Sequence, residues 1–137
     1  LVMDGRDFTV PEFPNGFFVG PTLFDNVKPD MTIAKEEIFG PVVSVVRAKD
    51  LDEVIELINT RGFANAACIY TNDGATAREF KYRVLPSMVG INIGIAAPMS
   101  FFPFGGAGGS MFGDTKAHGQ EIFNFFTDIK VVIQRWF

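Results

Sequence analysis

Three apolar segments alternate with two amphipathic segments between residues 42 and 93, and this alternation constrains the fold more than any other feature. Strands are predicted at residues 42–47, 66–71 and 88–93, because these runs are apolar and in part β-branched. They do not alternate with polar residues, which is typical of strands covered on both faces. Strand–helix–strand–helix–strand with short loops predicts an α/β fold, a parallel sheet with flanking helices.

Local signals mark the ends of the two predicted helices. Asp50 is predicted to cap the first helix, with Glu53 completing a capping box, and Gly62 to end it. Asp73 is predicted to cap the second helix, which ends before Pro86. The inward faces are predicted to comprise Leu51, Val54, Ile55 and Ile58 in the first helix, and Ala77, Phe80, Lys81 (through its stem) and Val84 in the second.

The two ends of the chain differ from this middle part. Residues 1–16 carry several turn signals and are predicted to be irregular, whereas residues 17–27 are predicted to be extended. Residues 96–113 are rich in Gly, Phe and Met without a period, which predicts a long functional or protein-covered loop. A helix is predicted at 118–127 and a strand at 130–136, and that strand needs an edge of this chain or of a neighbour to pair with.

Composition excludes several classes of partner. The net charge of −4 gives no basic surface, which argues against nucleic acid and anionic membranes. The apolar runs are too short to span a bilayer, and no signal-peptide pattern opens the chain. One cysteine excludes an internal disulfide. We therefore expect a reducing, soluble compartment, namely the cytoplasm, or the mitochondrial matrix in a eukaryote.

The run from Lys35 to Val42 places two carboxylates inside apolar sequence. A buried carboxylate costs several kcal/mol unless it accepts hydrogen bonds. The ribose hydroxyls of a dinucleotide are one source of such bonds. The other interpretation makes Glu36 and Glu37 a solvated turn after a short helix containing Thr32 to Lys35. From the two acidic residues alone, the solvated turn is favoured.

The other chemistry-bearing residues favour structural roles. Cys68 lies mid-strand between apolar residues, which is typical of a small core residue and not of a nucleophile. His118 is the only histidine and is predicted to lie at the surface or to cap a helix. One His and one buried Cys cannot supply a zinc site, so no metal is expected. The glycine-rich stretch 105–110 lacks the ending of a phosphate loop, and close backbone approach around a cleft is expected there.

Five motifs follow one another in the order found in a known family. They are Phe18–Leu23 (FVGPTL), Glu36–Val42 (EEIFGPV), Thr71–Asp73 (TND), Val89–Asn92 (VGIN) and Pro103–Gly106 (PFGG). Together they make the chain resemble the aldehyde dehydrogenase superfamily. The resemblance implies that Glu37 accepts hydrogen bonds from the nicotinamide ribose of NAD and that Phe39 packs beside the nicotinamide. It reverses the preference for a solvated turn.

Further motifs are similar to the methylmalonate-semialdehyde dehydrogenase branch of that family. They are Asp4–Arg6, Phe101–Phe104, Gly113-Asp114 and Ala117–Gly119. The branch implies NAD as cofactor, coenzyme A as co-substrate and a small-molecule aldehyde as substrate. It also implies that Phe101, Phe102 and Phe104 line the acyl pocket. The Ala107-Gly108 pair departs even from this branch, so the role of this departure is open.

The resemblance also indicates what the chain does not contain. In the family, the dinucleotide-binding domain and the catalytic cysteine lie upstream of the Glu37 turn, so no catalytic residue is expected here. That cysteine attacks the aldehyde, hydride transfer to NAD⁺ leaves a thioester, and coenzyme A takes the acyl group. We therefore expect residues 1–112 to be the C-terminal part of a catalytic α/β domain. Residues 113–137 are expected to be a terminal helix and an oligomerisation strand, with 130–136 joining a homo-oligomer.

A second hypothesis is a non-catalytic, stand-alone α/β module for assembly or regulation, derived from the same fold. On the first hypothesis, the chain alone is expected to be inactive as an aldehyde dehydrogenase. The sequence leaves open the exact aldehyde, the oligomer size and whether the 137 residues fold alone. An exposed sheet edge and an uncovered apolar face are expected in either case.

Overall fold

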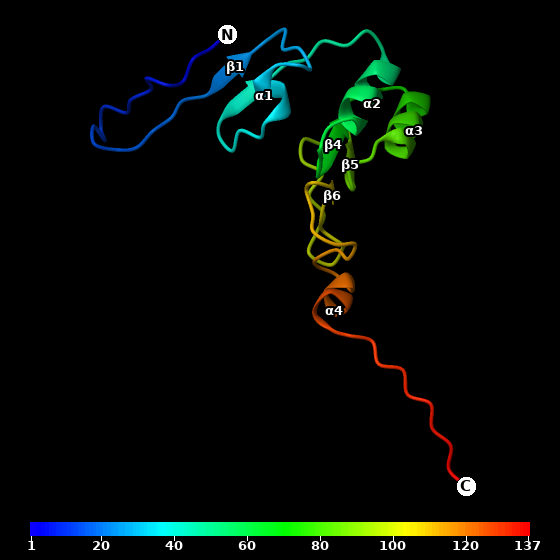
Figure 1. Ribbon diagram of the computed structural model, residues 1–137. Helices are drawn as coiled ribbons and strands as arrows, with labels where there is room; N and C mark the ends of the chain where they lie inside the picture. The colour runs from blue at the N-terminus through cyan, green and yellow to red at the C-terminus, as the bar shows by residue number, and fades with distance from the viewer. The chain divides into compact units, whose positions relative to one another are not determined.

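The computed structural model describes residues 1–137, with helices and short strands connected by long irregular segments (Figure 1). The chain divides into two compact units, unit 1 (Leu1–Glu53) and unit 2 (Val54–Phe137), and each is described by itself. The assignment of residues 1–112 and 113–137 to two functional parts stays a prediction.

Unit 1 is built on a parallel pair of strands. β1 (Thr22–Phe24) pairs with β2 (Val42–Ser44), so that Thr22 lies opposite Val42, and α1 (Thr32–Lys35) lies between them in the chain. The pairing continues past the assigned strands, because the Val45 amide donates to the Phe24 carbonyl at 2.9 Å. The predicted short helix over Thr32 to Lys35 is confirmed.

The N-terminal segment lies along the edge of β1 that β2 leaves free. Met3 lies antiparallel to Leu23, whose amide donates to the Met3 carbonyl at 3.0 Å. Gly20 and Gly5 approach so closely that a Cβ on Gly5 would lie 2.0 Å from the Gly20 oxygen. The prediction of purely irregular structure for residues 1–16 is therefore wrong near Met3. Turn signals indicate where a chain bends, but not the edge against which the bent segment lies.

Unit 2 contains most of α2 (Leu51–Asn59) and a second parallel pair. β4 (Ala66–Ile69) pairs with β5 (Met88–Ile91), and α3 (Gly74–Arg83) connects the two. A short antiparallel pair joins β3 (Phe63–Ala64) to β6 (Ala107–Gly108), and α4 (Glu121–Phe126) follows.

The predicted helix caps are confirmed. The Asp50 carboxylate accepts from the Glu53 amide at 2.9 Å, and the Glu53 carboxylate accepts in return from the Lys49 amide at 2.8 Å. The Asp73 carboxylate accepts from the Thr76 hydroxyl and amide and from the Ala75 amide. These bonds, the Thr76 hydroxyl first, lower the pKa of Asp73, because they stabilise its charged form.

The core of unit 2 is small. Its buried apolar side chains are Ile55, Ala64, Phe80 and Val84. Phe80 and Val84 confirm the predicted inward face of α3, whereas Lys81 is exposed, contrary to that prediction. Asn59 ties the ends of α2 and α3 together, since its side-chain amide donates to the Arg83 carbonyl and accepts from the Leu85 amide, both at 2.8 Å.

Asn92 extends the β4–β5 pair by one step. Its side-chain oxygen accepts from the Thr71 amide at 2.9 Å, and its side-chain nitrogen donates to the Thr71 carbonyl at 3.0 Å. The backbone of Asn92 is left-handed (φ +57°), a conformation that asparagine tolerates better than most residues. The side chain thus takes the place of a backbone partner where the strand turns away.

The three strands predicted within 42–93 form at the predicted places, each in a two-stranded parallel pair. β2 pairs with β1, while β4 pairs with β5. The faces are also not covered on both sides within the chain, because Val43 and Ile91 are exposed. Local sequence predicts a strand, whereas its neighbour is decided by non-local pairing. The uncovered apolar face expected from the sequence is present.

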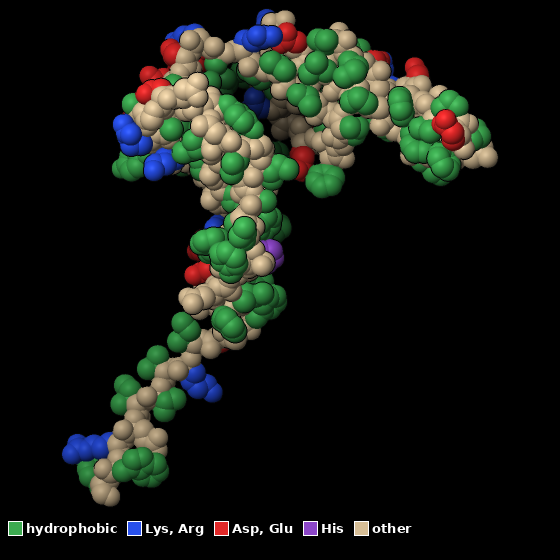
Figure 2. Space-filling model, turned by 180° about the vertical axis from the view of Figure 1, so that it is seen from behind, with side chains coloured by type: hydrophobic (Ala, Val, Ile, Leu, Met, Phe, Trp, Pro, Cys, Tyr) green, Lys and Arg blue, Asp and Glu red, His purple; other side chains and the backbone are tan.

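The end of the chain differs from its prediction. The predicted helix at 118–127 is confirmed in shortened form as α4, but no strand forms at 130–136. Residues 127–137 run away from α4 without secondary structure (Figure 1), and their apolar side chains are exposed (Figure 2). A strand needs an edge to pair with, and no segment of unit 2 pairs with these residues. None of the helices is both long and apolar enough to cross a membrane.

Candidate cofactor turn and aromatic loop

The predicted cofactor residues lie on the turn between α1 and β2 in unit 1. α1 ends because Glu36 adopts an extended conformation (φ −96°, ψ 141°) while its amide still donates to the Thr32 carbonyl. The chain then folds tightly, since the Gly40 amide donates to the Ile38 carbonyl at 2.9 Å and Val42 donates to Gly40 at 2.8 Å. The turn therefore carries Glu37 and Phe39 outward between two regular elements.

Both predicted cofactor residues are exposed in this chain. The Phe39 ring is 97% exposed, and the Glu37 side chain is also exposed. The argument from a buried carboxylate therefore does not apply to Glu37, and the turn itself matches the solvated alternative. An exposed carboxylate and an exposed ring two residues apart nonetheless fit a ligand that offers hydroxyl donors beside a flat ring. The assignment of NAD to this turn stays a prediction.

The predicted acyl-pocket residues lie together on a loop of unit 2. The Phe101 and Phe102 ring centroids are 4.7 Å apart. Phe104 forms an isolated bridge with Ala117, in which the two residues exchange backbone hydrogen bonds of 2.6 and 2.9 Å. All three phenylalanines are exposed. We call residues 100–104 the aromatic loop.

The glycine stretch after the aromatic loop allows close backbone contacts, as predicted. A Cβ on Gly106 would lie 2.7 Å from the Ser110 carbonyl oxygen, and Gly108 has a left-handed backbone (φ +56°). The stretch docks against β3, since the Ala64 amide donates to the Ser110 hydroxyl at 3.0 Å. The Ser87 hydroxyl donates to the Gly105 carbonyl. These contacts give the glycines a packing role.

Cys68 lies within a strand and His118 at the surface, as the sequence predicts, and their structural roles stay predictions. Cys68 is half-buried in β4, and a Cβ on Gly90 of β5 would lie 2.8 Å from its sulfur. It therefore fills the space that Gly90 leaves open. His118 is exposed, with a left-handed backbone (φ +70°) and its ring 5.4 Å from the Phe104 ring. No three His, Cys, Asp or Glu side chains lie close enough together to hold a metal ion.

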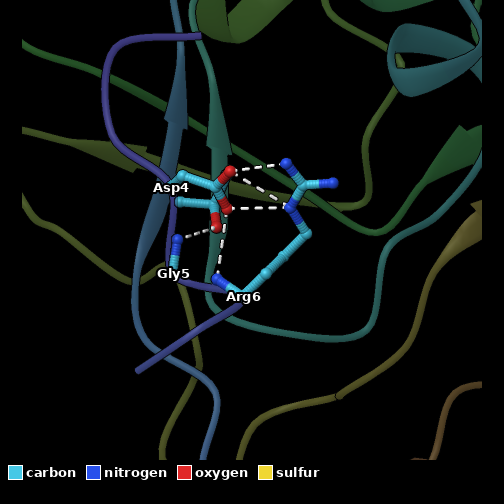
Figure 3. Close-up of polar contacts among 4 residues, drawn as sticks. Asp4, Gly5 and Arg6 are labelled. Carbon is cyan, nitrogen blue, oxygen red and sulfur yellow. Dashed lines mark hydrogen bonds and ion pairs between the residues drawn. The ribbon is translucent and has the colours of Figure 1, made fainter. Parts of the chain in front are cut away.

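An ion pair near the N-terminus was not predicted from the sequence. The Arg6 guanidinium contacts the Asp4 carboxylate through two nitrogens, at 2.9 Å from Nε and 2.6 Å from Nη2 (Figure 3). Arg6 lowers the pKa of Asp4 to about 2, mainly through these side-chain bonds. The Asp-x-Arg spacing was the available signal. The pair borders a hollow of about 230 Å³ lined by Leu1, Asp4, Arg6, Thr22 and Phe24. Because each charge satisfies the other, the pair offers no free reacting group.

The candidate residues thus form two groups. Glu37 and Phe39 lie on one turn of unit 1, and Phe101, Phe102 and Phe104 lie on the aromatic loop of unit 2. Residues are brought together within each group by local turns and by the pairing of the aromatic loop with Ala117.

Comparison with known proteins identifies the family. The profile of the aldehyde dehydrogenase family matches residues 1–132, nearly the whole chain. The chain belongs to this family. The resemblance inferred from the five motifs is confirmed at this level. Two of these motifs, Glu36–Val42 and Pro103–Gly106, lie in the Glu37 turn and at the end of the aromatic loop.

Within the aldehyde dehydrogenase family, the chain is similar to proteins named as malonate- or methylmalonate-semialdehyde dehydrogenases. The malonate-semialdehyde dehydrogenase of Halalkalibacterium halodurans is 51% identical over 136 residues. The methylmalonate-semialdehyde dehydrogenase DddC of Oceanimonas doudoroffii is a structural neighbour, with a TM-score of 0.92 and 47% identity over 98% of this chain. A Sinorhizobium meliloti 1021 protein assigned to the same activity and complexed with NAD has a TM-score of 0.92 and 46% identity.

This aldehyde dehydrogenase chain is short beside its relatives. It is matched over 99% of its own length by the H. halodurans protein, yet it spans only 28% of that protein. It likewise covers 28% of the DddC chain.

Proposed function

We propose that this chain is the C-terminal portion of an NAD-dependent, coenzyme A-acylating semialdehyde dehydrogenase that acts on malonate or methylmalonate semialdehyde. The observation that carries the proposal is the match of nearly the whole chain, at about half identity, to proteins named as malonate-semialdehyde dehydrogenases. The stand-alone regulatory module has no comparable support. The C-terminal placement rests on the order of the family motifs.

In this proposal, the α1–β2 turn holds the nicotinamide end of NAD, which supplies the hydride acceptor. Glu37 accepts hydrogen bonds from the ribose hydroxyls, and Phe39 packs beside the nicotinamide ring. Support comes from the exposure of both side chains on a turn fixed by α1 and β2. No group on this chain makes or breaks bonds, since the attacking thiolate belongs to upstream sequence.

The remaining assignments follow the same proposal. Phe101, Phe102 and Phe104 line the acyl pocket, where apolar rings exclude water from the acyl group. Coenzyme A removes the acyl group as a thioester. Residues 130–136 form a strand on the edge of a second subunit, which gives the exposed apolar residues Val131 and Ile133 a surface to cover. The complete enzyme acts in the cytoplasm, or in the matrix of a mitochondrion.

Glu37→Gln in the complete enzyme tests the cofactor turn. The amide removes the negative charge while keeping the size of the side chain, and it should weaken NAD⁺ binding about tenfold, since hydrogen bonds to a charged acceptor are the stronger ones. The matched control is Glu36→Gln, the same change on the preceding exposed residue. Isothermal titration with NAD⁺ measures both. Unchanged affinity in Glu37→Gln would remove Glu37 from the site.

The C-terminal placement has its own test. The purified 137-residue chain, mixed with NAD⁺, coenzyme A and methylmalonate semialdehyde, should produce no NADH. Turnover above the blank would refute the placement and make Cys68 a candidate nucleophile again. Sequencing the upstream reading frame gives an independent answer, because the proposal requires a contiguous cofactor domain that contains a cysteine.

A further inference from the structure

Lys116 contacts the glycine stretch that follows the aromatic loop. Its ammonium donates a hydrogen bond to the Gly106 carbonyl, and its side chain is half-buried. Its stem lies against Gly105, where an added Cβ would be 2.7 Å from the Lys116 Cδ. Lys116 therefore contacts both residues that follow Phe104: its ammonium bonds to Gly106, and its apolar stem packs on Gly105.

The residues next to Lys116 run along the aromatic loop. Ala117 exchanges two backbone hydrogen bonds with Phe104, and the Gly119 amide donates to the Ser100 carbonyl at 3.1 Å. Gly119 has a left-handed backbone (φ +59°), and a Cβ there would lie 2.6 Å from the Phe101 oxygen. The segment 116–119 thus contacts both ends of the aromatic loop, and Lys116 adds a contact just beyond Phe104.

We propose that Lys116 is a positioning residue for the aromatic loop and, through it, a determinant of affinity for the aldehyde substrate. The inference rests on the proposed function, in which the loop lines the acyl pocket. Gly105 and Gly106 have more backbone freedom than any other residue type, so Phe104 is followed by a flexible link. The bond from Lys116 to the Gly106 carbonyl restricts this link, together with the bond from the Ser87 hydroxyl to the Gly105 carbonyl. A charged donor suits this task, because its hydrogen bonds are stronger than neutral ones.

The test uses the complete enzyme and Lys116→Met, which keeps an unbranched apolar stem and removes the donor. The KM for methylmalonate semialdehyde should rise about fivefold, less than the roughly tenfold or more that one charge-assisted hydrogen bond is worth, because the loss reaches the substrate only through the loop. The KM for NAD⁺ should stay unchanged, and kcat should change less than the aldehyde KM. Lys81→Met is the matched control, since it makes the same change on an exposed lysine of α3.

Two further variants separate positioning from general destabilisation. Lys116→Arg keeps a cationic donor and should restore most of the aldehyde affinity. Gly105→Ala forces the Lys116 stem to move, so its effect should not add to that of Lys116→Met in a double-mutant cycle. Amide hydrogen exchange in Phe104 to Ala107 should accelerate in Lys116→Met but not in Lys81→Met, which gives a readout that does not depend on turnover.

The outcomes are distinguishable. A wild-type enzyme that does not oxidise the semialdehyde refutes the proposed function and this inference together. A working wild type with an unchanged aldehyde KM in Lys116→Met refutes this inference alone. Equal losses of NAD⁺ and aldehyde affinity, with Lys116→Arg no better than Lys116→Met, would reduce Lys116 to a structural residue and also overturn it.

Discussion

Replacing Phe80 by alanine should remove much of the stability of unit 2. Phe80 is 2% exposed and is the largest fully buried side chain of the chain. It lies on α3, which connects β4 and β5. A Phe→Ala change in a core costs about 3–5 kcal/mol, from lost burial and from the cavity left behind. Natural domains are stable by only roughly 5–15 kcal/mol in total.

Urea unfolding followed by far-UV circular dichroism measures this effect. The matched control is Tyr82→Ala, which truncates an aromatic ring on the same helix at a position that is 88% exposed. The control should change the free energy of unfolding by less than about 0.5 kcal/mol, as surface substitutions usually do. Both variants remove a ring from a helix and differ in burial, so the difference between them isolates the packing contribution.

Equal destabilisation by Phe80→Ala and Tyr82→Ala would refute the reasoning. It would mean that α3 does not use its Phe80 face to pack on the rest of unit 2. An unchanged urea midpoint in both variants would refute the reasoning in the same way. A lower midpoint confined to Phe80→Ala is the expected result.

Two smaller predictions concern exposed carboxylates. Arg6 holds the pKa of Asp4 at about 2, below its ordinary value of 3.8. The charged pair therefore contributes its full stabilisation above about pH 3.8, and this contribution is lost as the pH falls toward 2. Arg6→Gln should return the pKa of Asp4 toward 3.8 in an NMR titration, and added salt should shrink the wild-type shift; an unmoved pKa in the variant would contradict the pairing. Asp73→Ala should speed amide exchange at Ala75 and Thr76, which lose their acceptor, whereas Asp73→Asn should largely preserve protection; equal exchange in both variants would exclude a capping role.

Much of the local structure follows from short stretches of sequence. Asp50 and Asp73 cap helices where the sequence predicts caps, because a capping side chain bonds to amides only two or three residues away. The same holds for the short helix before Glu37. The candidate residues on each loop were also found from motifs that lie within a few residues of one another.

The partners of those segments were not predictable in this way. The Lys116 contact with Gly106 spans ten residues of irregular chain, and no periodic pattern marks it. The exposure of Glu37 likewise depends on what the rest of unit 1 places around the turn, whereas the sequence argument assumed that apolar neighbours in the chain imply burial.

The amino-acid sequence by itself determined the family, the positions of β2, β4 and β5, and the caps of α2 and α3. Only the tertiary structure decided that β2 pairs with β1 and β4 with β5, that Met3 lies beside Leu23, and that residues 130–136 form no strand. The physical reason is the range of the interactions. Helix caps and turns are satisfied by amides a few residues away, but a strand is completed by whichever edge the distant chain brings to it.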